Sequence, residues 1–253
     1  MTVDCTTHDD GGRLIARLSG VLCRPNVSDT RLLLLKCLAE QPSALFVDLT
    51  GLLVSEPLTL HVFTAAVRQA ARWPGTPVLL CGPQPETARL LDSAPYRRLQ
   101  VFASVEAARD HLGRGGHGLP TIVEDLLPVS GAARQSRNVA TDACLRWELP
   151  DLVAPASLIC SELVSNAVDH AATMMTLRLS VGNGYLSIAV RDGSAAEPVL
   201  TARSPTAARG RGLRLVLAVA HRWGFLPARD GKVVWASLLI SKRSPPSQSP
   251  AFA

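Results

Sequence analysis

The sequence predicts an α/β protein of two domains, from two observations. First, strand-like and helix-like segments alternate through residues 1–112, which is typical of an α/β layer structure. The expected strands there are 13–21, 44–49, 77–81 and 101–102, and the expected helices are 30–39, 58–73, 86–91 and 105–112. Second, four glycines fall within residues 113–118, a composition typical of a flexible linker. We therefore expect a Gly-rich linker at 113–128 between domains 1–112 and 129–240.

The second domain has a different order of elements. Two helices are expected first, at 131–149 and 155–172. Strands 175–181 and 185–191 follow, and the Asn183-Gly184 turn between them predicts a hairpin. A helix over 211–223 and a strand over 232–240 complete the domain. Residues 241–253 are rich in proline and serine, which predicts a disordered tail.

Composition excludes several function classes. No apolar run has membrane-spanning length, and the first residues carry no secretory signal pattern. The net charge of +5 is spread along the chain without a lysine-rich block, which argues against direct binding of nucleic acid. Six scattered cysteines form no C-x-x-C pair, so we expect reduced thiols in a cytoplasmic protein and no zinc site.

The helix over 155–172 carries the first candidate site. Glu162, Asn166 and Asp169 are spaced i, i+4 and i+7, so all three lie on one narrow face of the helix. A carboxylate and a carboxamide one turn apart can hold a metal-bound phosphate and a base in fixed register. A solvated polar stripe on an amphipathic helix is the ordinary alternative.

Two further features strengthen the functional interpretation. Asp192 ends a strand, where a carboxylate can accept a hydrogen bond from an exocyclic amine. Gly210 and Gly212 then open a helix, where backbone N–H groups and the helix dipole favour phosphate. Lys232 is expected to be a solvated charge at a strand end, and Trp235 a core residue.

The order of these motifs resembles the Bergerat (GHKL) ATP-binding fold of gyrase and sensor histidine kinases. Within it, residues 129–238 look most like the bacterial anti-sigma-factor serine kinases. The matching segments are Ser161-Glu162-Leu163-Val164-Ser165-Asn166-Ala167-Val168-Asp169-His170-Ala171, Val190-Arg191-Asp192, Gly210-Arg211-Gly212-Leu213-Arg214-Leu215-Val216 and Gly231-Lys232-Val233-Val234-Trp235. The resemblance implies a sandwich with helices on one face of a mixed sheet.

The resemblance also implies a role for each matching residue. Glu162 would be the catalytic base that takes a proton from a serine hydroxyl, and Asn166 would ligate Mg²⁺. Asp192 would bind the adenine amino group of ATP. The remaining nucleotide contacts would come from Asp169, Ser194, Gly210, Arg211, Gly212 and Leu213. Ser194 stands where the family usually has a second glycine.

Residues 1–112 resemble the STAS domain of anti-sigma-factor antagonists. The matching segments are Val47-Asp48-Leu49-Thr50-Gly51, Val78-Leu79-Leu80-Cys81-Gly82-Pro83 and Val101-Phe102-Ala103-Ser104-Val105-Glu106-Ala107-Ala108. In the family, the loop after the first segment carries the phosphoacceptor serine. Here the loop reads Ser55-Glu56-Pro57-Leu58-Thr59, so the domain is expected to lack its acceptor.

Together the resemblances imply an ATP-binding regulator, with Mg²⁺, that controls a sigma factor or a partner-switching cascade. It would act on a sigma factor or a separate STAS antagonist, with or without phosphorylation of a serine on that partner. The alternative is a catalytically inactive module that holds ATP only to shape a docking surface. Whether the chain is a protein serine/threonine kinase and whether it forms a homodimer are left open.

Overall fold

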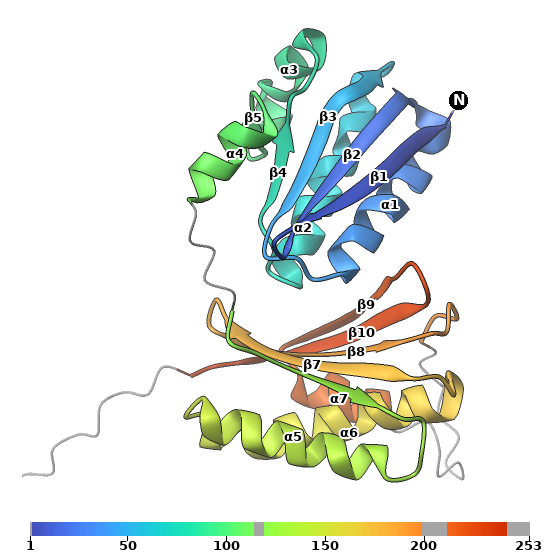
Figure 1. The fold of residues 1–253 in the computed structure, drawn as a ribbon, viewed down its shortest axis with the longest axis vertical. Helices are drawn as coiled ribbons and strands as arrows, with labels where there is room; N and C mark the ends of the chain where they lie inside the picture. Colours follow the sequence, from blue (N-terminus) through green and yellow to red (C-terminus); the bar gives the residue numbers. More distant parts are fainter. Residues whose placement is uncertain (1, 114–118, 199–211, 242–253) are drawn as a thin grey trace, which may run out of the picture.

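The computed structural model describes residues 2–113, 119–198 and 212–241. They form two five-stranded sheets, one in an N-terminal unit (residues 2–113) and one in a C-terminal unit (residues 119–241). The N-terminal unit stands on the outer face of the second sheet, whose other face is covered by helices (Figure 1). The fold is therefore α/β in both units, as expected.

The N-terminal sheet has the order β1-β2-β3-β4-β5. β1 pairs antiparallel with β2, and the remaining neighbours are parallel. Helices α1 and α2 pack on one face, and α4 covers a smaller core on the other. The bounds are β1 Val3–Asp10, β2 Arg13–Leu22, α1 Val27–Ala39, β3 Leu45–Val54, α2 His61–Arg72, β4 Val78–Cys81, α3 Pro85–Leu91, β5 Gln100–Phe102 and α4 Val105–Leu112.

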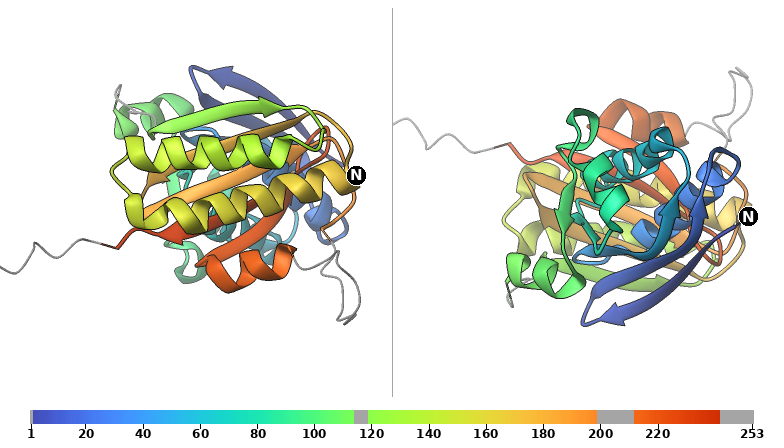
Figure 2. Two further views of the ribbon diagram at one scale, coloured as in Figure 1. Left: turned by 90° about the horizontal axis from the view of Figure 1, so that it is seen from below. Right: turned by 90° about the horizontal axis from the view of Figure 1, so that it is seen from above.

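The C-terminal sheet has the order β6-β7-β8-β10-β9, and every neighbouring pair is antiparallel. Helices α5, α6 and α7 lie side by side on its inner face (Figure 2). The bounds are β6 Thr121–Leu126, α5 Ala132–Arg146, α6 Val153–His170, β7 Met175–Gly182, β8 Tyr185–Asp192, α7 Gly212–Val219, β9 Arg222–Pro227 and β10 Lys232–Leu239.

Helix α6 is the central element of this unit. With the preceding turn, residues 150–170 are long and apolar enough to cross a membrane by length and composition alone. In the structure, however, its apolar side is core, because Ile159, Leu163 and Val164 are buried against the sheet and the neighbouring helices. Such burial is what a core helix of a globular unit requires.

Several sequence predictions need correction. The second sheet is antiparallel, not mixed, because its strands are joined by hairpins and by returns through helices. Residues 113–128 are not all linker, since β6 lies within them and pairs with β7; residues 114–118 lie outside the described part. Strand β1 was not expected, and the helix predicted to reach residue 223 ends at Val219, before strand β9 begins at Arg222. The predicted tail falls almost entirely on residues 242–253, outside the described part.

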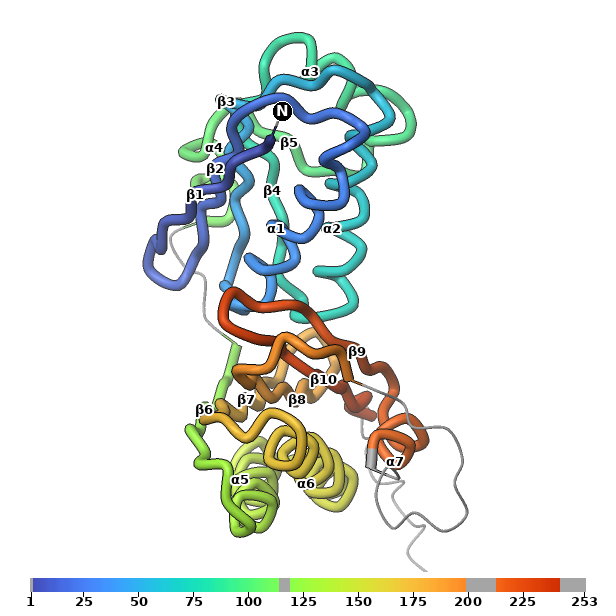
Figure 3. The backbone as a smooth tube through the Cα atoms, turned by 90° about the vertical axis from the view of Figure 1, so that its right-hand side faces the viewer, coloured from blue at the N-terminus to red at the C-terminus, as the bar shows by residue number. Residues whose placement is uncertain are grey.

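The two units share one apolar interface. The C-terminal ends of α1 and α2 point at β9 and β10 (Figure 3). Trp73, which follows α2, stacks on Trp235 of β10 with ring centroids 5.5 Å apart and planes 5° from parallel. Both indoles are 2% exposed, and they join one core cluster with Leu226 and Val233. Trp235 is thus core, as predicted, but it is the core between units.

A glycine makes room for this stack. Gly224 of β9 lies opposite Trp235 in the register of the two strands. A Cβ at position 224 would stand 2.8 Å from the Trp235 ring, closer than real Cβ contacts. The indole therefore lies flat across β9 only because residue 224 has no side chain.

We expect Trp73→Ala to lower the free energy of unfolding by about 3–5 kcal/mol, because it opens a cavity in the shared core. Urea denaturation of the full chain measures this change. Trp147→Ala is the control, since Trp147 is only partly buried and lies in the helical core of the C-terminal unit alone. If the Trp73 variant is as stable as the wild type, the stacked pair does not hold the units together.

Candidate functional site

The polar residues of α6 lie outside the core that its apolar residues form, as their spacing predicts. Glu162 and Asn166 are partly buried, and Asp169 is exposed. Within the part of the chain that the structure describes, the side chains of Glu162 and Asn166 have no hydrogen-bond or ion-pair partner. Two unpartnered polar groups one helical turn apart, at the edge of a core, are available to a ligand.

Asp192 lies at the end of β8, on the helical side of the sheet. Its cross-strand neighbour on β7 is Met175, which is part of the helical core. Because directly opposed residues share a face, Asp192 also points to that side. Its side chain is buried, with 4% of the residue exposed.

Lys232 is the partner of Asp192, and here the sequence prediction was wrong. Lys232 is only 7% exposed, and its Nζ donates to Asp192 Oδ1 at 2.8 Å and to the carbonyl of Ser194 at 3.2 Å. The Ser194 N–H donates to the same Oδ1 at 2.8 Å. A buried charge needs a partner and further hydrogen bonds, and this pair has both.

The end of β8 is tied to the end of α6. The Gly193 N–H donates to Thr173 Oγ1 at 2.9 Å, and Thr173 follows α6 closely in the chain. Helix α7, which starts at Gly212, packs beside α6, and Leu213 is buried in the same core. The fold therefore brings the α6 face, Asp192, Ser194 and the start of α7 to one edge. Gly210 and Arg211 lie outside the described residues.

The residues present fit a phosphate-bound Mg²⁺ better than a metal held by protein alone. Among the described residues no group of three His, Cys, Asp or Glu side chains could hold an ion. Mg²⁺ commonly keeps several waters and takes one or two protein ligands together with substrate phosphates. The side chain of Asn166, which has no partner among the described residues, can serve as such a single ligand.

The second candidate region is the loop after β3, where a phosphoacceptor would lie. Ser55 Oγ donates to the Leu22 carbonyl at 3.1 Å. Thr59 is 5% exposed, and its Oγ1 donates to the Glu56 carbonyl at 2.6 Å. The Pro57 carbonyl accepts from Tyr96 Oη at 2.9 Å. Both hydroxyls near the acceptor position are therefore held by the backbone.

Asp48, on the strand before this loop, accepts hydrogen bonds from Thr50 and Arg17. Burial disfavours its charged form, but Thr50 and Arg17 outweigh burial and lower the pKa of the carboxyl. The contacts are Thr50 N–H at 3.0 Å, Thr50 Oγ1 at 2.7 Å and Arg17 Nε at 2.8 Å. Asp48 and Thr50 lie within β3, and Arg17 lies opposite Asp48 on β2. Strand β3 continues to Val54, beyond residue 49 where the predicted strand ended.

Comparison with known proteins identifies the N-terminal unit. Residues 4–108 match the STAS domain family. The N-terminal unit is a STAS domain. Among solved structures, the chain is similar to an anti-sigma factor antagonist from Mycobacterium paratuberculosis, with 16% identity and a TM-score of 0.37 over 42% of this chain and 90% of that one. It is also similar to the anti-sigma factor antagonist SpoIIAA in its unphosphorylated form, with 14% identity and a TM-score of 0.36 over 43% and 96% of the two chains. No curated protein matches.

We expect Lys232→Met to destabilise the protein by about 3–5 kcal/mol, because it leaves the Asp192 carboxylate buried without its cation. The double variant Asp192→Asn/Lys232→Met should lose less than the sum of the two single variants, since it removes both charges. Urea denaturation gives the three values. Lys36→Met is the control, because Lys36 makes no ion pair with any described residue. Additive losses would mean that Asp192 and Lys232 do not interact.

Proposed function

We propose that residues 129–240 form a Bergerat-type ATP-binding domain and that the chain is an ATP-dependent regulator in a partner-switching cascade that controls a sigma factor. The proposal places this activity in the cytoplasm. One observation carries it: Glu162 and Asn166, neither of which has a partner among the described residues, lie at the same edge as the buried Asp192 and the start of α7. The resemblance of the sequence motifs to anti-sigma-factor serine kinases supports it independently.

The proposal assigns a task to each of these residues. Asp192 accepts a hydrogen bond from the adenine amino group, while its Oδ1 stays paired with Lys232 and the Ser194 N–H. Asn166 binds Mg²⁺, which when present neutralises charge on the phosphates. Glu162, one helical turn before Asn166, accepts the proton of an attacking serine hydroxyl. Gly212 and Leu213 supply the helix start that favours phosphate.

The STAS domain is then a docked regulatory unit and not a substrate of its own chain. Its loop 55–59 lies at the N-terminal end of α2, whereas Trp73 at the other end touches the C-terminal sheet. Helix α2 has 12 residues, which corresponds to about 18 Å. Moreover, helix α6 lies on the far side of that sheet (Figure 1). Self-phosphorylation would require the two units to separate.

The alternative function is an ATP-dependent binding module without transfer. The specific observation in its favour is the missing acceptor, because the residues at the loop centre, Pro57 and Leu58, carry no hydroxyl. A chain that presents a STAS domain locked in its unphosphorylated form can compete with true antagonists for partners. The transfer experiment below separates the two functions.

We expect the full chain to bind Mg·ATP in isothermal titration calorimetry. Asn166→Ala should weaken binding by about 10-fold or more, since it removes the predicted metal ligand without breaking a contact within the described protein. Asn138→Ala, an exposed asparagine on α5, is the control and should bind as the wild type does. Equal affinity of the Asn166 variant and the wild type would rule out this site.

We expect transfer to a separate STAS protein that carries an acceptor serine, and none to Ser55 or Thr59. Mass spectrometry after incubation with Mg·ATP detects phosphate on the separate STAS protein and on Ser55 or Thr59. Glu162→Gln keeps the shape of the side chain but cannot accept the proton, so transfer should fall by about 100-fold or more while ATP binding persists. Stoichiometric phosphate on Ser55 or Thr59 would contradict the docked arrangement. ATP binding with no transfer to any acceptor would favour the binding module.

A further inference from the structure

Two pairs of residues connect the domain interface with the candidate nucleotide site. Arg191 and Asp192 are consecutive on β8, so their side chains point to opposite faces of the sheet. Asp192 faces the helices, and Arg191 faces the STAS domain. Around the β9–β10 turn, Lys232 pairs with Asp192, whereas Asp230 pairs with Arg191. A shift of the end of β8 or of the start of β10 would therefore change the ion pairs on both faces of the sheet together.

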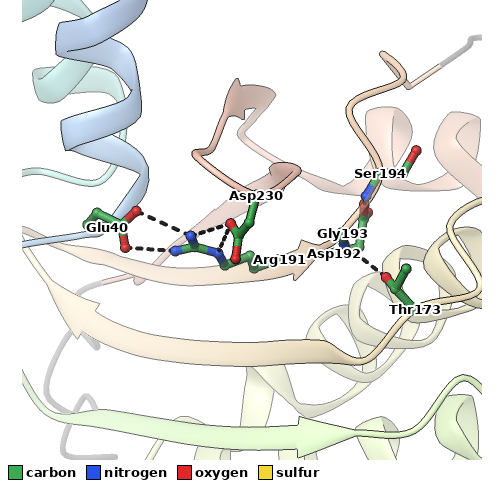
Figure 4. Close-up of polar contacts among 7 residues, drawn as sticks. All are labelled: Glu40, Thr173, Arg191, Asp192, Gly193, Ser194 and Asp230. Carbon is green, nitrogen blue, oxygen red and sulfur yellow. Dashed lines mark hydrogen bonds and ion pairs between the residues drawn. The ribbon is translucent and has the colours of Figure 1, made fainter.

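On the interface side, Arg191 is held by two carboxylates (Figure 4). Glu40, which follows α1 of the STAS domain, accepts from Nη1 at 2.8 Å and from Nη2 at 3.2 Å. Asp230 accepts from Nη2 at 2.5 Å and from Nε at 3.2 Å. The hydrogen bonds with Glu40 raise the pKa of Arg191, and Arg191 in turn lowers the pKa of Asp230. We call these three residues the interdomain clamp.

Backbone contacts make the connection between the faces stiff. Val233 lies opposite Arg191, and Lys232 lies opposite Asp192, in one antiparallel register. Gly231 closes the turn so tightly that a Cβ there would stand 1.9 Å from the Asp192 carbonyl oxygen. The turn that carries Asp230 therefore rests directly on the strand end that carries Asp192. Asp230 and Lys232 are thus held by the same turn, one on Arg191 and the other on Asp192.

We propose that Glu40 and Arg191 are positioning residues, through which the docked STAS domain holds Asp192 in its nucleotide-binding arrangement. The inference rests on the proposed function, because it concerns the affinity of that same site. The clamp fixes the end of β8 and the β9–β10 turn, so that Lys232 stays on Asp192 Oδ1 and the carboxylate keeps one orientation. Without the clamp, the Asp192 carboxylate has to be ordered when the nucleotide binds, and this entropic cost lowers the affinity for the nucleotide.

Linkage makes the effect reciprocal. If docking of the STAS domain strengthens nucleotide binding by some factor, the nucleotide strengthens docking by the same factor. The signal would run from α1 through Glu40 and Arg191 to Asp192, or in the opposite direction. A protein partner that pulls on the STAS domain would thereby release nucleotide, and this gives the fused chain a means to report ATP to its partner.

The test uses Glu40→Gln and Asp230→Asn in the full chain, with Glu86→Gln on exposed α3 as the control. Titration calorimetry with Mg·ATP should show affinity lowered by about 5- to 30-fold in both clamp variants and unchanged in the control. Hydrogen exchange adds a readout that a purely structural role would not move. In the wild type, Mg·ATP should slow exchange of the amides at residues 38–41, and in Glu40→Gln this protection should be lost.

The outcomes separate the two proposals. If the wild type binds Mg·ATP and both clamp variants bind it equally well, the clamp does not position Asp192 and the inference fails alone. If nucleotide leaves exchange at residues 38–41 unchanged in the wild type, the reciprocal link is absent and the inference fails as well. If the wild type binds no nucleotide, the proposed function fails and the inference falls with it.

Discussion

The structure depends on the burial of the outer face of the C-terminal sheet. β10 carries apolar side chains on both faces, with Val233 and Trp235 on one and Val234, Ala236 and Leu238 on the other. A sheet of this kind needs a layer on each side, because an exposed apolar patch of that extent is unfavourable in water. Helices α5 to α7 provide one layer. The STAS domain provides the other, so its docking is part of the fold of the C-terminal unit.

This layering separates the STAS loop 55–59 from helix α6. The STAS loop 55–59, which follows β3, lies at the end of that domain remote from the C-terminal sheet, while helix α6 lies on the opposite side of this sheet (Figure 1). The surfaces on which partner proteins would act are thus separated. The C-terminal sheet lies between the two regions, and on it the consecutive residues Arg191 and Asp192 point to opposite faces.

Local sequence signals were sufficient to predict elements whose structure depends on neighbouring residues in the chain. The Asn183-Gly184 turn has both residues at positive φ and joins β7 to β8 as expected. The polar face of α6 also follows from its spacing. Strands β1 and β6 were missed because they are edge strands with many polar residues, and the pairing partner of β6 lies about 50 residues further along the chain. The Asp9-Asp10-Gly11-Gly12 segment was the signal that could have revealed the β1–β2 hairpin.

The buried Lys232 could not be predicted from its own surroundings in the sequence. A lysine at a strand end is usually solvated, and only the register of β8 and β10 places it beside Asp192, 40 residues away. The same holds for Arg191 and Glu40, which are 151 residues apart and come from different units. Contacts of this range arise from tertiary packing and not from periodicity, so they are found only once the two sheets have been placed.

The account depends on the STAS domain being docked on the outer face of the C-terminal sheet, through the Trp73–Trp235 stack and the Arg191–Glu40 ion pair. Residual dipolar couplings of the full chain in a weakly aligning medium test it most directly, because each unit reports its own alignment tensor. We expect one tensor to fit the backbone amides of both units in the arrangement described. Two different tensors, or a common tensor that fits only after one unit is rotated, would contradict the account.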